Sequence, residues 1–354
     1  MCGCEPPTLL KSRPLRLHDG MIAKRKIGRT GLETSVLGFG CGPIGGLYAP
    51  VPDAQAVAAV RAAWDGGIRY FDVAPLYGTG LAEHRIGAAL RDEPGDFVIS
   101  TKVGRLLRPK TGRAIEPHRP PFEIVYDYSY DGVMRSVEDS FQRMGLTRID
   151  ILYIHDVNRR WHGDAVEERF KEVMEGGYRA LDKLRAEGVV KALGVGMNDS
   201  GMLERFADVA DFDCFMLAGR YTLLEQTPLD SLFPLCERKG ISIVAAGPFN
   251  SGILATGASA GAKYFYKDAP PEILETTRAI EAVCARHGVP LAAAALQFAL
   301  GHPVVASVAT GMVSEAEVRA NLDHMERPIP HDLWQELKAE GLIRADTPVP
   351  GGTG

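Results

Sequence analysis

Short apolar segments alternate with helical segments along almost the whole 354-residue chain, and this alternation constrains the fold more than any other feature. The apolar segments are near-continuous runs, as in strands of a parallel sheet that is covered on both faces. Repeated strand–helix units without a long interruption favour an α/β fold of the closed (β/α)8 TIM-barrel type over an open doubly wound sheet. The predicted strands are 35–40, 69–74, 97–102, 149–155, 190–196, 214–219, 241–246 and 304–309.

Helical patterns lie between these strands, and their ends carry the expected signals. Pro52 and Asp53 open the first helix, and Gly188 and Gly240 follow two others, as C-terminal caps do. No linker-like stretch divides the chain, so we expect a loose tail over 1–22 and a single domain over 23–354. The predicted helices are 53–66, 82–91, 131–145, 164–187, 200–209, 229–240, 272–288 and 314–325.

Composition narrows the class of protein. A chain of this length with 45% hydrophobic residues builds a core without a disulfide or metal. The formal net charge of −5, with both signs interspersed, gives no reason to expect a nucleic acid or membrane partner. The six cysteines form no paired framework, and Cys2 and Cys4 lack a second pair that would complete a metal site. We therefore expect reduced thiols in a cytoplasmic protein without bound metal.

Two connections are longer than the others and both follow predicted strands. Residues 103–130 contain several prolines and a late cluster of tyrosines, and residues 247–271 are rich in Gly and Ala. Loops after barrel strands lie at the C-terminal rim, where barrel enzymes keep their sites. Loops of this length are uncommon unless they serve a function or are disordered. We predict that these two loops wall the substrate pocket.

The segment from Gly40 to Gly45 matches GxGxxG and follows a strand, as in dinucleotide-binding folds. That fingerprint requires a helix that begins inside the motif, with its N-terminus on the pyrophosphate. Pro43, Pro50 and Pro52 interrupt the segment where the helix would run. We therefore reject this reading and expect the glycines to let the backbone pass close to a ligand at the barrel rim.

Four ionisable residues lie at the ends of successive predicted strands: Asp72, Tyr77, Lys102 and His155. The carboxyl ends of neighbouring parallel strands share one rim, so we expect these side chains to converge. A carboxylate keeps a buried lysine charged, and the ammonium favours tyrosinate and moves the tyrosine pKa toward neutrality. Each residue alone is more often a cap, a packing residue or a solvated residue. Their joint placement predicts an acid/base site in which the histidine hydrogen-bonds the reacting oxygen.

The segments FDVAPLYGTGLAE, STK, DILYIHD and GRTGLETSVLGFG resemble those of the aldo-keto reductase family, over about residues 24–325. The resemblance implies a (β/α)8 barrel that uses a nicotinamide cofactor without a Rossmann fold and without metal. It also implies that the four residues are a catalytic tetrad, with Tyr77 as general acid/base.

Further segments, DYSYDGVMRSVEDS, GVGMND, AGRYTLLEQ and AGPFNSGIL, are similar to those of the family's NAD(P)-dependent dehydrogenases of aldoses (L-fucose, D-threo-aldose) and of pyridoxal. Such substrates present a cyclic hemiacetal that is oxidised to a lactone. The sequence leaves sugar and pyridoxal open. A pyridine ring favours aromatic stacking, a sugar favours convergent polar groups, and the aromatic candidates are Tyr126, Tyr128, Tyr130, Trp161 and Phe249.

The resemblance also implies the cofactor contacts. The glycine-rich loop after the seventh strand would hold the pyrophosphate, and the segment ATGMVSEAEVRANL would hold the adenosine end. The chain departs from the family where Ala218 and Ala246 replace a glutamine and an aromatic residue; Arg220 and Tyr221 would either compensate or serve packing. The predicted cofactor residues are Asn198, Tyr221, Gly247, Pro248, Phe249, Asn250, Gly252, Gly311, Ser314, Glu317 and Asn321.

Glu317 bears on the choice of cofactor. NADP-preferring relatives often carry a basic residue four positions before the matching asparagine, whereas a carboxylate accepts hydrogen bonds from ribose hydroxyls and repels a 2′-phosphate. We therefore expect NAD to be preferred over NADP. The alternative is that Glu317 is only a solvated residue on the helix.

Other classes of function remain open from sequence. One is an NADPH-dependent reductase of small aldehydes or ketones, and another is a non-catalytic barrel that binds nucleotide. A third is a metal-dependent hydrolase using His155, Asp156 and His162, whose adjacent positions suit that role poorly. The leading prediction is an oxidoreductase acting on a small carbonyl or hemiacetal substrate, of unknown oligomeric state.

Overall fold

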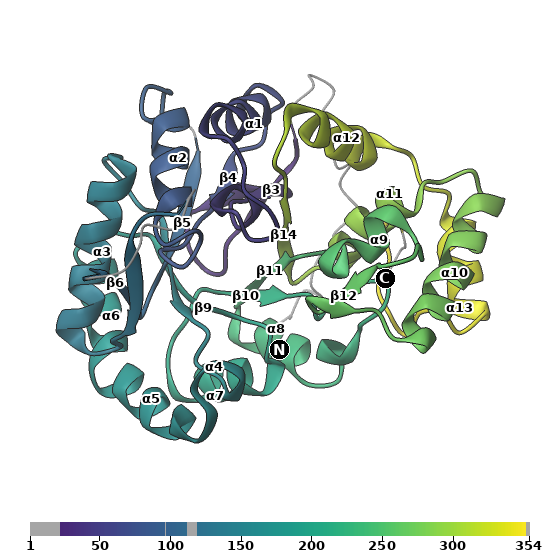
Figure 1. Cartoon of the computed structure of the whole chain (residues 1–354). Helices are drawn as coiled ribbons and strands as arrows, with labels where there is room; N and C mark the ends of the chain where they lie inside the picture. The colour runs from purple at the N-terminus through teal and green to yellow at the C-terminus, as the bar shows by residue number, and fades with distance from the viewer. Residues whose placement is uncertain (1–21, 96, 112–118, 352–354) are drawn as a thin grey trace, which may run out of the picture.

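The computed structural model describes residues 22–95, 97–111 and 119–351, and its centre is a closed barrel of eight parallel strands (Figure 1). The strands follow one another around the barrel in the order β10-β11-β14-β3-β4-β5-β8-β9. Each overlaps one of the eight predicted segments, so the predicted barrel is confirmed. The bounds are β3 (Leu37–Gly40), β4 (Tyr70–Asp72), β5 (Val98–Val103), β8 (Ile151–His155), β9 (Ala192–Met197), β10 (Cys214–Ala218), β11 (Ser242–Ala246) and β14 (Val305–Gly311).

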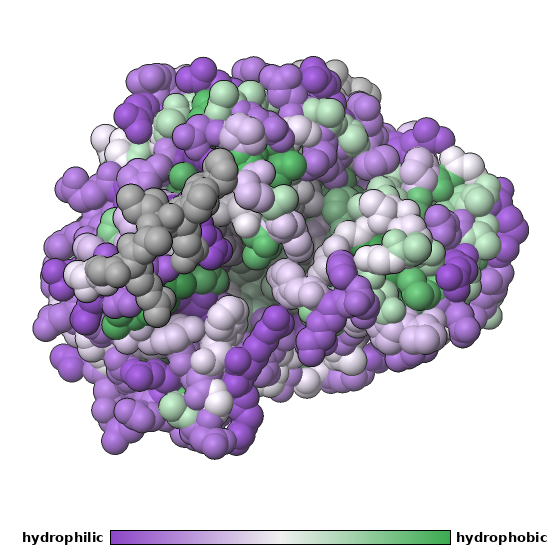
Figure 2. Space-filling model, in the orientation of Figure 1, coloured by the Kyte–Doolittle hydropathy of each residue, from purple (hydrophilic) through white to green (hydrophobic). Residues whose placement is uncertain are grey.

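Helices surround the strands in Figure 1, and all but one of the predicted helices are present as continuous elements. The space-filling view in the same orientation is hydrophilic over most of its outline and is hollowed near its centre (Figure 2). The confirmed helices are α1 (Asp53–Asp65), α2 (Leu81–Leu90), α3 (Tyr130–Met144), α7 (Ser200–Val209), α8 (Leu232–Lys239), α10 (Pro271–Arg286) and α12 (Glu315–Glu326).

The exception is the predicted helix over 164–187, which the structure divides. It consists of η2 (Gly163–Ala165), α5 (Val166–Glu172), a π-helical turn η3 (Val173–Gly177) and α6 (Tyr178–Ala186). A Cβ at Gly176 would lie 2.7 Å from the Tyr130 nitrogen, and one at Gly177 would lie 2.6 Å from the Tyr128 oxygen. The irregular turn therefore falls where this segment packs directly on the backbone that leads into α3.

The structure adds elements that the sequence pattern did not show. In α11 (Leu291–Phe298) every residue is buried, so the helix has no polar face and no amphipathic period. The predicted pocket walls carry two hairpins, β6 (Arg105–Pro109) with β7 (Phe122–Tyr126) and β12 (Lys263–Tyr264) with β13 (Lys267–Asp268). The remaining elements are β1 (Lys24–Lys26), β2 (Glu33–Ser35), η1 (Pro43–Gly45), α4 (Arg159–His162), η4 (Thr227–Leu229), η5 (Asn250–Gly252), α9 (Ile253–Thr256), η6 (Ala299–Gly301) and α13 (His331–Ala339).

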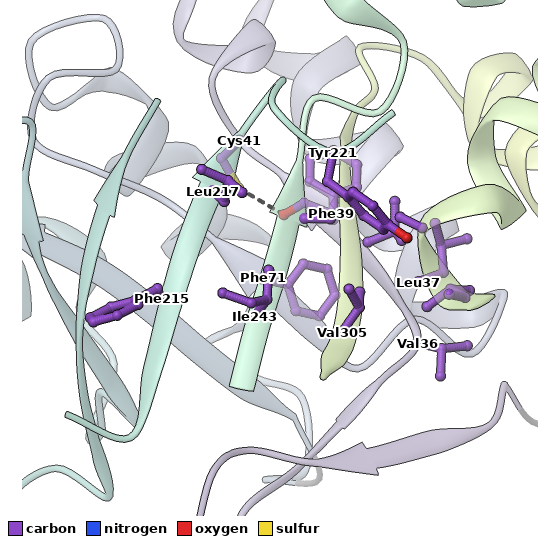
Figure 3. Packing of buried hydrophobic residues seen from close by; sticks show 14 of the residues in the cluster. Val36, Leu37, Phe39, Cys41, Phe71, Phe215, Leu217, Tyr221, Ile243 and Val305 are labelled. Carbon is purple, nitrogen blue, oxygen red and sulfur yellow. Dashed lines mark hydrogen bonds between the residues drawn. The ribbon is translucent and has the colours of Figure 1, made fainter. Parts of the chain in front are cut away.

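Two buried clusters make the core. The larger cluster, part of which Figure 3 shows around Phe39, Phe71 and Ile243, joins the strands to the surrounding helices. The smaller cluster includes Tyr70 and Tyr153, whose hydroxyls are fully buried. Ile22 is buried in the larger cluster, so residue 22 belongs to the folded domain and not to the predicted tail. The remainder of that tail, with Cys2 and Cys4, lies outside the described residues.

The four cysteines in the described ranges, Cys41, Cys214, Cys236 and Cys284, are buried free thiols. Over the same ranges, no single helix is long and apolar enough to span a membrane. Only the pair formed by α10 and the segment 291–301 meets that test jointly, and its two parts are bent by 103°.

Trp334 provides a test of how α13 is attached. Its side chain is fully buried and packs on Phe298 of α11, with ring centroids 6.2 Å apart. We expect Trp334→Ala to lower the free energy of unfolding by about 3–5 kcal/mol, because a large cavity is left behind. Urea denaturation followed by circular dichroism measures the change. Val209→Ala on the exposed end of α7 is the control, expected within about 0.5 kcal/mol of wild type; a similar small effect for Trp334→Ala would contradict the packing role.

Candidate active site

The four ionisable residues meet at the carboxyl-end rim of the barrel. Asp72 ends β4 and His155 ends β8, with Lys102 on β5 between them. The Lys102 Nζ lies 2.6 Å from Asp72 Oδ2 and 4.8 Å from the centre of the Tyr77 ring. The Tyr77 and His155 rings lie edge to face, with centroids 6.1 Å apart. The predicted convergence of carboxylate, ammonium, phenol and imidazole is therefore present in the structure.

The turn that carries Tyr77 is held by close backbone packing. A Cβ at Gly45 would lie 2.6 Å from the Tyr77 carbonyl carbon, and one at Gly78, where φ is +64°, would lie 2.3 Å from the Gly45 oxygen. Only glycine fits both positions. The segment after Gly40 forms a 3-10 turn at Pro43 and no α-helix, as expected. Gly45, however, packs against the Tyr77 turn instead of lining a ligand.

Asp72 is supported from inside the barrel by a chain of hydroxyl groups. The Ser100 hydroxyl donates to Asp72 Oδ1 at 2.7 Å, and the Tyr70 hydroxyl lies 3.1 Å from that of Ser100. The Tyr153 hydroxyl continues the chain at 3.3 Å from Tyr70. All of these groups are fully buried, so they fix the carboxylate while its second oxygen accepts from Lys102. No local sequence signal marks this support, although Tyr70, Ser100 and Tyr153 lie on predicted strands.

Burial and charge set the protonation states of the site. Burial tends to lower the pKa of Lys102, but Asp72 and Tyr77 beside it raise that pKa above its ordinary value, so the ammonium persists. Burial raises the pKa of Tyr77 to about 12, despite the opposing effect of Lys102. Lys102 acts to lower the Tyr77 pKa, as predicted, but the pKa does not move toward neutrality, because desolvation of the phenolate outweighs the attraction.

His155 is a neutral imidazole at the edge of the site. Burial, with Arg105 and Lys102 nearby, lowers its pKa well below the ordinary value. Its Nδ1 is buried without a hydrogen-bond partner, and its backbone oxygen accepts from the Tyr128 hydroxyl at 2.7 Å. Tyr128, predicted as a stacking candidate, is fully buried and instead anchors the histidine backbone.

The predicted pyrophosphate loop has the backbone of an anion cradle. Gly247, Asn250, Ser251 and Gly252 all have positive φ, with values from +45° to +107°. Such left-handed turns direct successive N–H groups to one side. Asn250 donates from Nδ2 to the Gly219 oxygen at 3.1 Å, and its buried Oδ1 has no partner. Pro248 is buried and Phe249 is half-buried against the core, so they shape the loop.

The predicted adenosine end is a capped helix start. The Ser314 hydroxyl accepts from the Glu317 nitrogen at 3.2 Å, and Glu317 Oε2 accepts from the Val313 nitrogen at 2.9 Å. Glu317 is therefore a capping residue and not merely a solvated one. Asn321 donates to the Glu317 oxygen and leaves its own buried Oδ1 without a partner. A Cβ at Gly311 would lie 2.5 Å from the Pro43 ring, so packing alone explains that glycine.

Two predicted contacts near the nicotinamide end differ in outcome. Asn198 lines a cavity of about 720 Å³ together with Asn158, Arg220 and Phe265. Arg220 donates from Nε to the Asn198 oxygen at 3.0 Å and lies over the Phe265 ring, so it holds the rim together. Tyr221, in contrast, is 1% exposed and packs between Phe233 and Phe298. Its prediction as a cofactor contact is wrong, because its ring belongs to the core.

These features fit a nucleotide bound along the rim. The left-handed backbone at Gly247 and at 250–252 and the helix N-terminus at Ser314 present N–H groups that suit phosphate, and the unpartnered amide oxygens of Asn250 and Asn321 suit ribose hydroxyls. The cluster around Tyr77 offers a proton-transferring group at the same rim. A second groove, of about 870 Å³, is lined by Arg29, Arg185 and Asp213 and includes none of these residues.

The protein is a closed barrel, and a buried Asp–Lys pair lies at its rim against a tyrosine and a histidine. This combination defines a class of barrel oxidoreductases. The family model for the aldo/keto reductase family matches residues 36–340. The chain belongs to that family, as the sequence resemblance indicated, and it is an oxidoreductase of a family that uses NAD(P) cofactors.

Several characterised proteins are similar to it. Pyridoxal 4-dehydrogenase from Microbacterium luteolum is 46% identical over 92% of this chain and 100% of its own length. D-threo-aldose 1-dehydrogenase from a Pseudomonas species is 42% identical over 88% of this chain and 96% of its own. Among solved structures, the holo form of aldo-keto reductase AKR11C1 from Bacillus halodurans matches with a TM-score of 0.72 and 27% identity, covering 92% and 97% of the two chains.

The raised pKa of Tyr77 predicts how the rate of oxidation should depend on pH if Tyr77 removes the proton. Below about pH 10 the phenol is mostly protonated, so the tyrosinate fraction grows about tenfold for each pH unit. We expect kcat/KM for substrate oxidation to rise with pH over about pH 7–10, with a slope near 1 on a logarithmic plot. Initial rates in overlapping buffers measure this profile. A flat profile above about pH 8 would show that another group removes the proton.

Proposed function

We propose that the protein oxidises a cyclic hemiacetal, an aldose or pyridoxal, to its lactone with reduction of a nicotinamide cofactor. The observation that carries the proposal is the buried Lys102–Asp72 pair at 2.6 Å beneath the Tyr77 ring. The two relatives at 46% and 42% identity, named as dehydrogenases of pyridoxal and of D-threo-aldose, support this substrate class.

Tyr77, Lys102 and His155 each have a separate role in the proposed reaction. Tyr77, as general base, accepts the proton of the hemiacetal hydroxyl, and the positive Lys102 stabilises the negative charge that develops on the phenol and the reacting oxygen. His155 is neutral and hydrogen-bonds the same oxygen, which orients the carbon. Bound NAD(P)+ supplies the acceptor for the hydride that leaves this carbon. The products are lactone, reduced nicotinamide and one proton, which passes from Tyr77 to solvent.

The aromatic side chains that could stack on a substrate differ in how much of each is exposed. Trp161 is 42% exposed and Tyr126 is half-buried, and both lie against the Arg105 guanidinium. Tyr130 begins α3 and is half-buried. Trp161 is thus the most exposed of the aromatic candidates, and it lies next to a charged group that suits hydroxyls.

The proposal is tested with a substrate panel of L-fucose, D-arabinose, L-galactose and pyridoxal. We expect oxidation of at least one of them, seen as nicotinamide absorbance, to depend on added NAD+ or NADP+. Tyr77→Phe should lower kcat by about a thousandfold or more with the fold retained by circular dichroism, because the phenol oxygen is the base. Oxidation of none of the four would contradict the proposed substrate class.

The same panel separates the alternatives. Reduction of small aldehydes with NADPH, without oxidation of any hemiacetal, would instead identify a carbonyl reductase. Nucleotide binding without turnover would identify a non-catalytic barrel. Within the described residues, no cluster of three or more His, Cys, Asp or Glu side chains is placed to hold a metal ion. Asp156 instead pairs with Arg105, and His162 lies 3.1 Å from the Tyr128 hydroxyl.

We further propose that NAD is the preferred cofactor. Glu317 places a carboxylate at the start of α12, beside the Ser314 cap and the unpartnered Asn321 oxygen. A 2′-phosphate at this position would meet like charge, whereas ribose hydroxyls would find an acceptor.

Glu317→Gln separates charge from capping, because the amide oxygen still accepts from the Val313 nitrogen. We expect wild type to favour NAD+ in kcat/KM, and Glu317→Gln to improve NADP+ relative to NAD+ by about tenfold. Glu315→Gln, in the same exposed first turn, is the matched control and should leave the ratio unchanged. Equal or better efficiency of wild type with NADP+ would contradict the proposal.

A further inference from the structure

A second buried ion pair lies next to the tetrad. Arg105, the first residue of β6, is 1% exposed, and its Nη2 donates to Asp156 Oδ2 at 2.8 Å. The same carboxylate oxygen lies 3.4 Å from His155 Nε2. Asp156 therefore connects the Arg105 guanidinium to the His155 imidazole, whose ring lies edge to face with that of Tyr77.

The guanidinium has unused hydrogen-bonding capacity. Arg105 Nε and Nη1 are buried and make no hydrogen bond of good geometry, although the guanidinium lies close enough to the Tyr128 hydroxyl to lower its pKa. The Trp161 ring centre lies 4.4 Å from the guanidinium carbon, and the Tyr126 ring centre lies 5.4 Å from it. The aromatic rings hold the group in place but accept no strong hydrogen bond, so the Tyr128 oxygen is the polar neighbour of these two donors on this side.

Asp156 is held in an unfavourable backbone conformation. Its φ is +53°, a region that residues other than glycine adopt at a cost. Burial raises the pKa of Asp156 above its ordinary value, and Arg105, Lys102 and Arg160 oppose that rise by favouring the charged form. The Asp156 side chain is nevertheless 13% exposed, unlike Arg105. A strained, partly exposed carboxylate supported by a buried cation is an arrangement that suits recognition of a ligand.

We propose that Arg105 and Asp156 form a hydroxyl-recognition pair that selects substrates carrying a hydroxyl near the reacting carbon. The inference rests on the proposed function and specifies its substrate. In an aldose this group is the C2 hydroxyl, and in pyridoxal it is the ring 3-hydroxyl, one carbon further away. The hydroxyl donates to the Asp156 carboxylate and accepts from an Arg105 donor, so one pair serves both kinds of ring.

The test compares each substrate with its deoxy analogue: L-fucose with 2-deoxy-L-fucose, and pyridoxal with 3-deoxypyridoxal. In wild type we expect loss of the hydroxyl to lower kcat/KM by about tenfold to a hundredfold, as for a hydrogen bond to a charged group. This comparison needs no variant. Equal efficiency with and without the hydroxyl, in both pairs, would overturn the proposal.

Asp156→Asn tests whether the Asp156 carboxylate is the group that recognises the substrate hydroxyl. It should lower kcat/KM for the hydroxylated substrate about tenfold or more, and for the deoxy analogue by less than about threefold. An equal loss on both would show that Asp156 acts only by positioning His155, and would overturn the recognition role. Asp150→Asn is the matched control, since Asp150 is a buried, ion-paired carboxylate immediately before β8 at its other end. Thermal melting confirms that each variant is folded.

Arg105→Lys keeps the charge and removes the forked donors, so it should show the same selective loss if those donors bind the hydroxyl. Absence of any selective loss in both Asp156→Asn and Arg105→Lys would overturn the proposal. Failure of wild type to oxidise either hydroxylated substrate would be a different result, which removes the proposed function and this inference with it.

Discussion

The buried ion pair between Lys102 and Asp72 is the interaction on which the rest of the site depends. Two charges that are almost completely removed from water are tolerable only when their geometry is good and their remaining hydrogen bonds are made. Here the carboxylate has Ser100 on its other oxygen, and the ammonium also donates to the Val73 backbone oxygen at 3.0 Å. The pair keeps a positive charge under the Tyr77 ring without a solvent counterion.

The barrel makes this pair possible by its order of strands. β4, β5 and β8 are adjacent and parallel, so residues at their carboxyl ends approach one another from separate parts of the chain. The interior supplies the buried hydroxyls of Tyr70 and Tyr153, which extend the support of Asp72 into the core. The proposed catalytic geometry and stability thus share the same strands, whereas the β6–β7 hairpin and the loop 247–271 extend from the rim.

Two groups of residues lie at the rim of the barrel: the tetrad, and the neighbouring residues Arg105, Asp156 and Trp161. Asp72, Lys102 and His155 are buried at strand ends, and glycine contacts hold the turn that carries the half-buried Tyr77. Arg105, Asp156 and Trp161 come from the β6 start and the segment after β8, and they place charge and an exposed ring beside His155. In the proposed function the tetrad acts at the hemiacetal carbon, and the proposed recognition pair, Arg105 and Asp156, selects a hydroxyl near that carbon.

The sequence by itself determined the eight strands, most helices and the four ionisable residues, because apolar runs, glycine caps and polar strand ends are local signals. It did not show α11, which lacks a polar face, or the break in the helix over 164–187, which packing of Gly176 and Gly177 imposes. Only the tertiary structure decided that Tyr221 is a core residue, that desolvation dominates the Tyr77 pKa, and that Arg105 reaches Asp156. Each of these depends on what surrounds a side chain in space, and burial and distance between remote residues are not encoded in local spacing.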